Sequence, residues 1–115
     1  MEQHTLHNSI IKKYNFLKEM YQDNYFPNDL VDKGKVILLQ LCQQIELQEP
    51  KELSAFYALT HAATEQFNDL EEEFGAAGSE IETAAREAIA LDFNMIALAY
   101  GYEADIEEMI APREW

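Results

Sequence analysis

Asp92 is the first candidate for chemistry, because it is an acidic residue in an otherwise apolar stretch. At 100° per residue it shares a helix face with Ala88, Ile89 and Ile96. An unpaired buried carboxylate is costly, so such a group either accepts hydrogen bonds or takes up a proton. Two interpretations follow: a structural carboxylate that bonds a neighbouring hydroxyl and fixes helix register, or a functional carboxylate in a pocket.

The residues expected to meet Asp92 lie on the preceding predicted helix. The short connection 75–78 predicts that helices over 51–74 and 79–101 are antiparallel neighbours, which pairs positions whose numbers sum to about 153. Asp92 then lies level with the start of the sequence Thr-His-Ala-Ala-Thr. The candidate pocket or buried polar cluster therefore comprises six residues, with Arg86 also expected in an ion-pair cluster: Asp92, Thr60, Thr64, His61, Tyr57 and Arg86.

Other chemical signatures are weak. His4 and His7 have the spacing of two metal ligands on a helix, but two ligands on a loose chain end do not make a site. The sequence Lys-Gly-Lys at 33–35 matches only part of a phosphate-binding loop, and no strand precedes it. Cys42 is the single cysteine and lies in an apolar run, which favours a buried, inert thiol. The sequence thus has no recognisable catalytic, metal or cofactor signature.

Net charge restricts the class of partner. Residues 1–50 carry 5 basic and 7 acidic side chains, a net charge of −2, whereas residues 51–115 carry 3 basic and 15 acidic side chains, a net charge of −12. Such a field repels phosphate backbones, so we expect no binding to nucleic acid. It permits a basic protein partner.

Length and apolar runs indicate a single cytoplasmic domain over residues 1–115. The N-terminus lacks the apolar core of a signal peptide, and apolar runs such as 36–39 are too short to span a bilayer. A chain of 115 residues suits one domain. Residues 1–8 are polar, and we expect them to be disordered.

Amphipathic periodicity predicts an all-α fold, an antiparallel four-helix bundle with a short fifth C-terminal helix. The four long helices are expected over about 8–21, 28–48, 51–74 and 79–101, and the short one over 102–110. Ser79 and Glu82 have the spacing of a capping box, and Gly101 sits where a helix prefers a left-handed residue after its end. Gly34 indicates a close helix crossing, and Trp115 is expected to dock onto the body.

Several runs of the chain are similar to a known family. They are 25–27 (YFP), 30–35 (LVDKGK), 59–65 (LTHAATE), 79–87 (SEIETAARE), 92–93 (DF), 100–101 (YG) and 110–115 (IAPREW). Together they resemble a family of small bacterial proteins described only as domain of unknown function 5713. The resemblance covers nearly the whole chain after about Ser9 and implies a bacterial source and a stand-alone domain. It implies no activity and no catalytic residue.

Three functional hypotheses remain open. The first is a small acidic protein-binding module in a bacterial cytoplasm, whose second half meets a basic partner. The second is a ligand-binding or enzymatic bundle with an inter-helix pocket around Asp92, Thr60, Thr64 and His61. The third is a homodimer through an apolar helix face, suggested by aromatic residues that exceed what a thin first helix needs: Tyr14, Phe16, Tyr21 and Tyr25.

Overall fold

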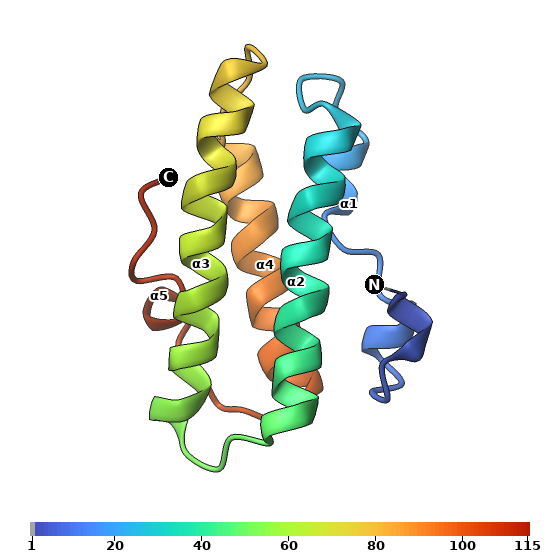
Figure 1. Cartoon of the computed structure of the whole chain (residues 1–115), viewed down its shortest axis with the longest axis vertical. Helices are drawn as coiled ribbons and strands as arrows, with labels where there is room; N and C mark the ends of the chain where they lie inside the picture. The colour runs from blue at the N-terminus through green and yellow to red at the C-terminus, as the bar shows by residue number, and fades with distance from the viewer. Residues whose placement is uncertain (1) are drawn as a thin grey trace.

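The computed structural model of the chain describes residues 2–115, which form helices and no strand. The three long helices are α2 (Asn28–Gln48), α3 (Leu53–Ala76) and α4 (Thr83–Ala99). The short elements are the 3-10 helices η1 (Gln3–Thr5) and η2 (Ile11–Lys13) and the α-helices α1 (Lys18–Tyr21) and α5 (Ile106–Met109). Consecutive long helices run in opposite directions, and α4 lies behind α2 and α3 (Figure 1).

Helix α2 has the bounds that the sequence predicts. It begins behind Pro27, whose φ of −58° suits a helix start, and Leu30 N–H donates to the Pro27 carbonyl at 3.0 Å. It ends at Glu49, which has a left-handed φ of 46°. Gly34 lies on its inner face, where an added Cβ would come within 3.0 Å of the Leu17 side chain and 3.2 Å of the Phe67 ring. The predicted close approach at Gly34 is confirmed.

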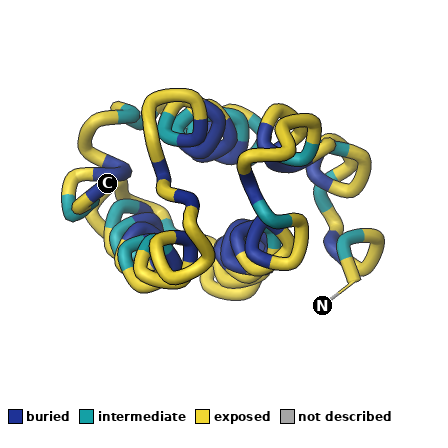
Figure 2. Tube along the Cα trace, turned by 90° about the horizontal axis from the view of Figure 1, so that it is seen from above, coloured by how far each residue is buried: buried dark blue, intermediate teal, exposed yellow. Residues whose placement is uncertain are grey.

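The long helices bury their apolar faces against one another. Figure 2 shows buried residues turned toward the interior of the molecule and exposed residues on its outside. Helices α3 and α4 meet through the rings of Phe67 and Phe93, whose centroids are 6.1 Å apart. The two helices therefore touch through these rings, but the pairing of 67 with 93 departs from the predicted register, in which 67 would lie level with about 86.

The capping box predicted at Ser79 and Glu82 is wrong. Gly78, with a φ of 81°, ends α3, and Ser79 N–H donates to the Phe74 carbonyl at 2.8 Å. That bond is the six-to-one hydrogen bond of a Schellman motif, which spans more residues than the other bond of the motif. Ser79 therefore belongs to the end of α3. Helix α4 begins later, at Thr83, and Glu82 makes no side-chain cap.

Gly101 ends α4 as the sequence predicts. Its φ is also 81°, Gly101 N–H donates to the Leu98 carbonyl at 3.2 Å, and Tyr102 N–H donates to the Ala97 carbonyl at 2.8 Å. The chain reverses direction at this motif. Tyr100 and Tyr102 consequently lie on either side of the turn.

The first predicted helix, over 8–21, is wrong. Its place is taken by η2, an extended stretch and the single turn of α1. Leu17 interrupts the helical pattern with a φ of 55°, and the apolar Ile10 is 53% exposed. The four-helix bundle is therefore not confirmed, although the all-helical class is. Within the segment expected to be disordered, residues 3–5 form η1 and Leu6 is 3% exposed; Met1 lies outside the described residues.

The C-terminal segment follows α3 on the flank opposite the N-terminal segment (Figure 1). The short helix predicted there exists as α5, with shorter bounds. Trp115 docks onto Phe67, with 6.2 Å between the ring centroids, as expected. Among residues 2–115, no helix combines the length and the apolarity that crossing a bilayer requires.

Candidate functional site

Asp92 on α4 is buried, 3% exposed, and each of its oxygens accepts one hydrogen bond. The Tyr14 hydroxyl donates to Oδ1 at 2.6 Å, and Leu17 N–H donates to Oδ2 at 2.7 Å. Burial raises the pKa of Asp92 to about 6, even though both hydrogen bonds favour the charged form and act to lower it. Asp92 therefore holds the segment that precedes α2.

Leu17 adopts a rare backbone conformation at this contact. Its φ and ψ of 55° and 34° lie in the left-handed region, which costs a residue with a Cβ roughly 1–2 kcal/mol. Its side chain is 1% exposed and packs on Gly34. Burial of this side chain and the bond to Asp92 offset the backbone strain.

A cavity of about 350 Å³ lies beside Asp92, between η2, α1 and α4. Lys13, Lys18 and Glu19 contribute charged side chains to its lining. Both oxygens of Asp92 already hold protein donors, so two of its roughly four acceptor positions remain for a ligand.

The hydrogen bonds predicted between Asp92 and the α3 hydroxyls are wrong. The Thr60 hydroxyl donates to the Tyr57 carbonyl at 3.0 Å. The Thr64 hydroxyl donates to the Thr60 carbonyl at 2.9 Å and to the Met109 carbonyl at 3.2 Å. Both hydroxyls are fully buried, but they bond within α3 and to α5, not to α4.

Tyr57 and His61 also bind the segment around α5. The Tyr57 hydroxyl accepts a hydrogen bond from Asp105 N–H at 3.0 Å. His61 Nε2 lies 2.7 Å from the Glu108 carbonyl oxygen and 3.2 Å from its carboxylate. The structure thus brings Tyr57, His61 and Thr64 together as one polar row on α3, and it separates that row from Asp92.

The polar row on α3 extends to Asn68, which the sequence does not single out. Asn68 Nδ2 donates to the Pro112 carbonyl at 3.0 Å, and its Oδ1 accepts from Glu114 N–H at 2.8 Å. The recurrence of polar residues at 57, 61, 64 and 68, about one helix turn apart, is the signal that indicates this face. The row satisfies backbone groups of a segment that has little secondary structure of its own.

Carboxylates converge where α3 ends and α4 begins. The pKa of Glu71 is raised by partial burial and then by the charges of Glu80 and Glu114, while Arg86 acts to lower it. Within residues 2–115, Arg86 forms no ion pair within 4.0 Å, and its buried Nε has no hydrogen-bond partner. The expected ion-pair cluster at Arg86 is therefore wrong, and the negative charge there is only partly compensated.

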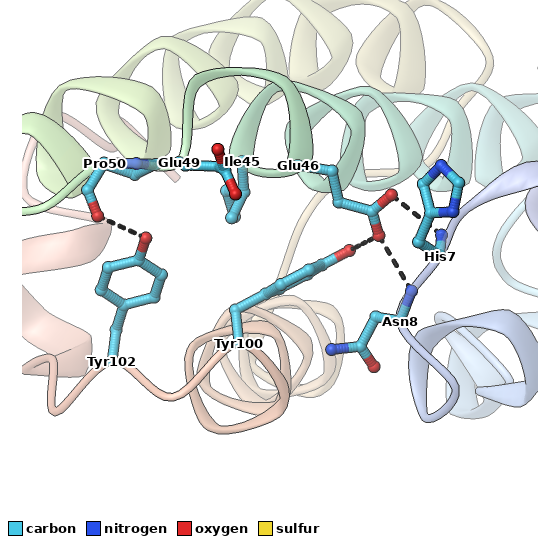
Figure 3. Close-up of a pocket in the computed structure, with 8 residues that line it drawn as sticks. All are labelled: His7, Asn8, Ile45, Glu46, Glu49, Pro50, Tyr100 and Tyr102. Atoms are coloured by element: carbon cyan, nitrogen blue, oxygen red, sulfur yellow. Dashed lines mark hydrogen bonds between the residues drawn. The ribbon is translucent and has the colours of Figure 1, made fainter.

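Glu46 is a second carboxylate that holds the N-terminal segment, and sequence reasoning missed it. On α2, its oxygens accept from His7 N–H at 2.9 Å, Asn8 N–H at 3.1 Å and the Tyr100 hydroxyl at 2.5 Å (Figure 3). Partial burial acts to raise the pKa of Glu46, but the bonds from Tyr100 and the two backbone N–H groups lower it below its usual value. Its position one turn after the buried Cys42 was the available signal.

A cavity of about 600 Å³ adjoins Glu46. In Figure 3 the tyrosine rings that flank Gly101 lie across from the end of α2. The cavity is lined mainly by polar and aromatic residues, and its full lining is His7, Asn8, Ile45, Glu46, Glu49, Pro50, Tyr100 and Tyr102. The Tyr102 hydroxyl donates to the Pro50 carbonyl at 2.6 Å, which fixes that ring against the segment that follows α2.

The histidines and carboxylates are the side chains that could bind a metal ion. Across residues 2–115, no three His, Cys, Asp or Glu side chains are grouped as a metal site requires. His4 lies 3.4 Å from the Glu2 carboxylate, and the backbone N–H of His7 is bound to Glu46.

Comparison with known families places the chain. Residues 10–115 match a family of unknown function, DUF5713. The chain belongs to DUF5713. The resemblance identified in the sequence is thereby confirmed. No match was found among curated proteins or among solved structures.

The DUF5713 match includes Asp92 with both of its partners, Tyr14 and Leu17. It includes Glu46, but it begins after His7 and Asn8. In this DUF5713 protein the two contacts have the same form, a carboxylate that binds a tyrosine hydroxyl and backbone N–H groups of the N-terminal segment.

Proposed function

We propose that this DUF5713 protein is a small acidic protein-binding module that docks a basic protein partner. The main support for this proposal is that Glu71, Glu80 and Glu114 come close together from three separate segments. The pKa of Glu71 is raised by burial and by the charges of the other two residues. Carboxylates held close together repel one another, and a cationic partner would relieve that repulsion. Complementary charge would also speed the encounter.

The charges near these residues support the choice of surface, which we call the acidic end. It comprises exposed or half-buried carboxylates at the end of α3, on the connection to α4 and next to the C-terminal Trp115: Glu71, Glu72, Glu73, Glu80, Glu82 and Glu114. Lys33 pairs with Glu73 across α2 and α3. Residues 51–115 contain three basic side chains, of which Arg113 pairs with Glu107. The acidic end therefore keeps a strong negative field.

The proposed setting is a bacterial cytoplasm. Cys42 is fully buried and unpaired, and burial raises the pKa of its thiol to about 12. Such a thiol is protected from oxidation because it is neither exposed nor ionised. The family resemblance adds the bacterial source.

A native-lysate capture experiment with charge variants tests the proposal. The chain would be immobilised, and a captured protein would be compared between the wild type and a variant with Glu71, Glu72, Glu80 and Glu82 changed to Gln. The matched control carries the same number of Glu→Gln changes at exposed residues elsewhere: Glu2, Glu19, Glu52 and Glu103. The two variants have equal net charge and differ only in where the charge was removed.

We expect the captured protein to be basic, to bind the control variant as it binds the wild type, and to be lost from the acidic-end variant. Equal retention by both variants would contradict the proposal. Equal loss from both would also contradict it, because it would show attraction by net charge without a defined surface. Circular dichroism of each variant checks that the helices are intact.

The alternative function is a small-ligand or enzymatic site at Asp92. It is favoured by the cavity of about 350 Å³ beside that residue and by a pKa of about 6, since shifted carboxyl groups gather at functional sites. Of the predicted pocket, Asp92 alone lines this cavity; Thr60, Thr64 and His61 do not. A gain in stability on Asp92→Leu would support the alternative, because functional carboxylates often lower stability.

A further inference from the structure

The cavity of about 600 Å³ lies at the opposite end of the molecule from the acidic end. It sits where α2 ends and where α4 reverses into Tyr102, whereas the acidic end sits at the α3–α4 connection (Figure 1). Either site can therefore exist without the other. Its volume falls within the range of small-molecule pockets, about 300–1,000 Å³.

Two carboxylates give this cavity negative charge. Glu46 is held in place by three donors, which occupy three of its roughly four acceptor positions. Glu49 is exposed, and within residues 2–115 it makes no side-chain hydrogen bond and no ion pair within 4.0 Å. The pKa of Tyr102 is raised first by burial and second by the negative charge of Glu49. The charge of Glu49 therefore acts on a tyrosine that lines the cavity.

Two aromatic rings give the cavity a surface that favours cations. Tyr100 is fixed by its bond to Glu46, and Tyr102 by its bond to the Pro50 carbonyl. Tyr102 stacks on Phe56 with 4.2 Å between centroids, so one face of its ring is backed by protein. A cation is attracted to the face of such a ring, and more strongly when the site is partly desolvated.

We propose that this cavity binds a small organic cation carrying a primary ammonium or a guanidinium group. The charged group of the ligand would lie by Glu49 and the free acceptor position of Glu46. The methylene chain of the ligand would lie along Tyr100 and Tyr102. An N–H donor matches Glu46 and Glu49, which form no ion pair within 4.0 Å among residues 2–115, although His7 in the same lining also acts on Glu46. A bare metal ion fits less well, because no three metal-ligating side chains are grouped among residues 2–115.

Hexamethylenediamine is a suitable probe, and the diol of the same chain length is its neutral counterpart. Calorimetric titration of the full chain would measure both, at low and at moderate salt. Glu49→Gln removes charge from the cavity, and Glu65→Gln removes the same charge from an exposed position on α3 that belongs neither to the cavity nor to the acidic end. Both residues are exposed, so both variants should fold as the wild type does.

We expect the diamine to bind, the diol to give no detectable binding, and Glu49→Gln to weaken the diamine about tenfold while Glu65→Gln leaves the dissociation constant unchanged within about twofold. Amide signals of residues 45–49 and 100–102 should shift on titration. Equal binding of diol and diamine, or equal weakening by the two Gln variants, would overturn the proposal. Failure of the diamine to bind the wild type at low salt would overturn it as well, and it would leave the acidic end untouched.

Discussion

Two carboxylates that do similar structural work, Asp92 and Glu46, have pKa values shifted in opposite directions. Asp92 is almost fully buried, so the loss of hydration outweighs its two hydrogen bonds and its pKa rises to about 6. Glu46 is half-buried and accepts three hydrogen bonds, which outweigh the smaller loss of hydration and lower its pKa. The balance between burial and donors therefore decides the sign at each site.

The titration of Asp92 gives a pH-dependent stability of known sign. Its pKa rises from 3.8 to about 6 on folding, so the native state binds the proton more tightly and the free energy of unfolding falls as pH rises through this window. Asp92→Asn lacks this contribution. At about 1.4 kcal/mol per unit, the free energy of unfolding of the variant should rise by roughly 2 kcal/mol relative to that of the wild type between about pH 4 and about pH 7.

Urea unfolding of both proteins at the two pH values measures this difference, and Asp69→Asn, an exposed acid on α3, serves as the control. A difference that stays constant with pH, or that changes in the opposite direction, would show that the pKa of Asp92 is not raised by burial.

At the same scale, the sequence predicted that Asp92 is buried and hydrogen-bonded, but it did not predict the partners. Tyr14 and Leu17 lie in a stretch whose pattern is amphipathic, and a residue within a helix has its N–H already bonded to its own helix. Leu17 can donate to Asp92 because the chain leaves the helical conformation there. That departure depends on a contact with α4, which local sequence does not encode.

The helices α2, α3 and α4 were predictable because each has a continuous apolar face and has a proline or glycine near one or both of its ends. Pro27 before α2, and Gly101 after α4, mark boundaries that the structure reproduces. The predicted start of α4 at Ser79 was wrong, because Gly78 and Ser79 form a Schellman motif at the end of α3. One Ser can satisfy either helix end, and sequence alone did not tell which one.

The glycines at the end of α3 provide a test of this element boundary. Gly75 lies within α3, and a Cβ there would meet nothing within 4 Å, so Gly75→Ala should raise stability by about 0.5–1 kcal/mol. Gly78 also has open space, but its φ is 81°, so Gly78→Ala should lower stability by roughly 1–2 kcal/mol. Chemical denaturation of both variants checks the opposite signs; two changes of the same sign would place the end of α3 elsewhere.

Across the whole molecule, side chains of the long helices hold both terminal segments. Asp92 and Glu46 bind backbone N–H groups of the N-terminal segment, and the polar row on α3 binds backbone groups of the C-terminal one. Segments without regular secondary structure need such partners for their backbone polar groups. The polar residues in the helix seams are thus explained by structure. Among residues 2–115, Glu73 is the one member of the acidic end whose side chain has a bonded partner, Lys33.

The homodimer stays a prediction, but the aromatic residues of the N-terminal segment support it less than the sequence indicated. Phe16 is buried, and the hydroxyls of Tyr14 and Tyr21 bond to Asp92 and Asp32. These aromatic residues are therefore used within the chain. Tyr25 is 41% exposed, and its ring packs edge-on against the neighbouring Phe26.

The most direct test of the proposed function is a titration of the labelled chain with a short peptide of alternating Lys and Ala, followed by two-dimensional amide NMR. We expect the largest shifts at residues 71–82 and at Glu114, and we expect them to vanish in the variant with Glu71, Glu72, Glu80 and Glu82 changed to Gln. Absence of shifts at residues 71–82, or shifts spread evenly over all acidic residues, would contradict a basic-partner site at the acidic end; shifts at Tyr100 and Tyr102 would report the separate cavity.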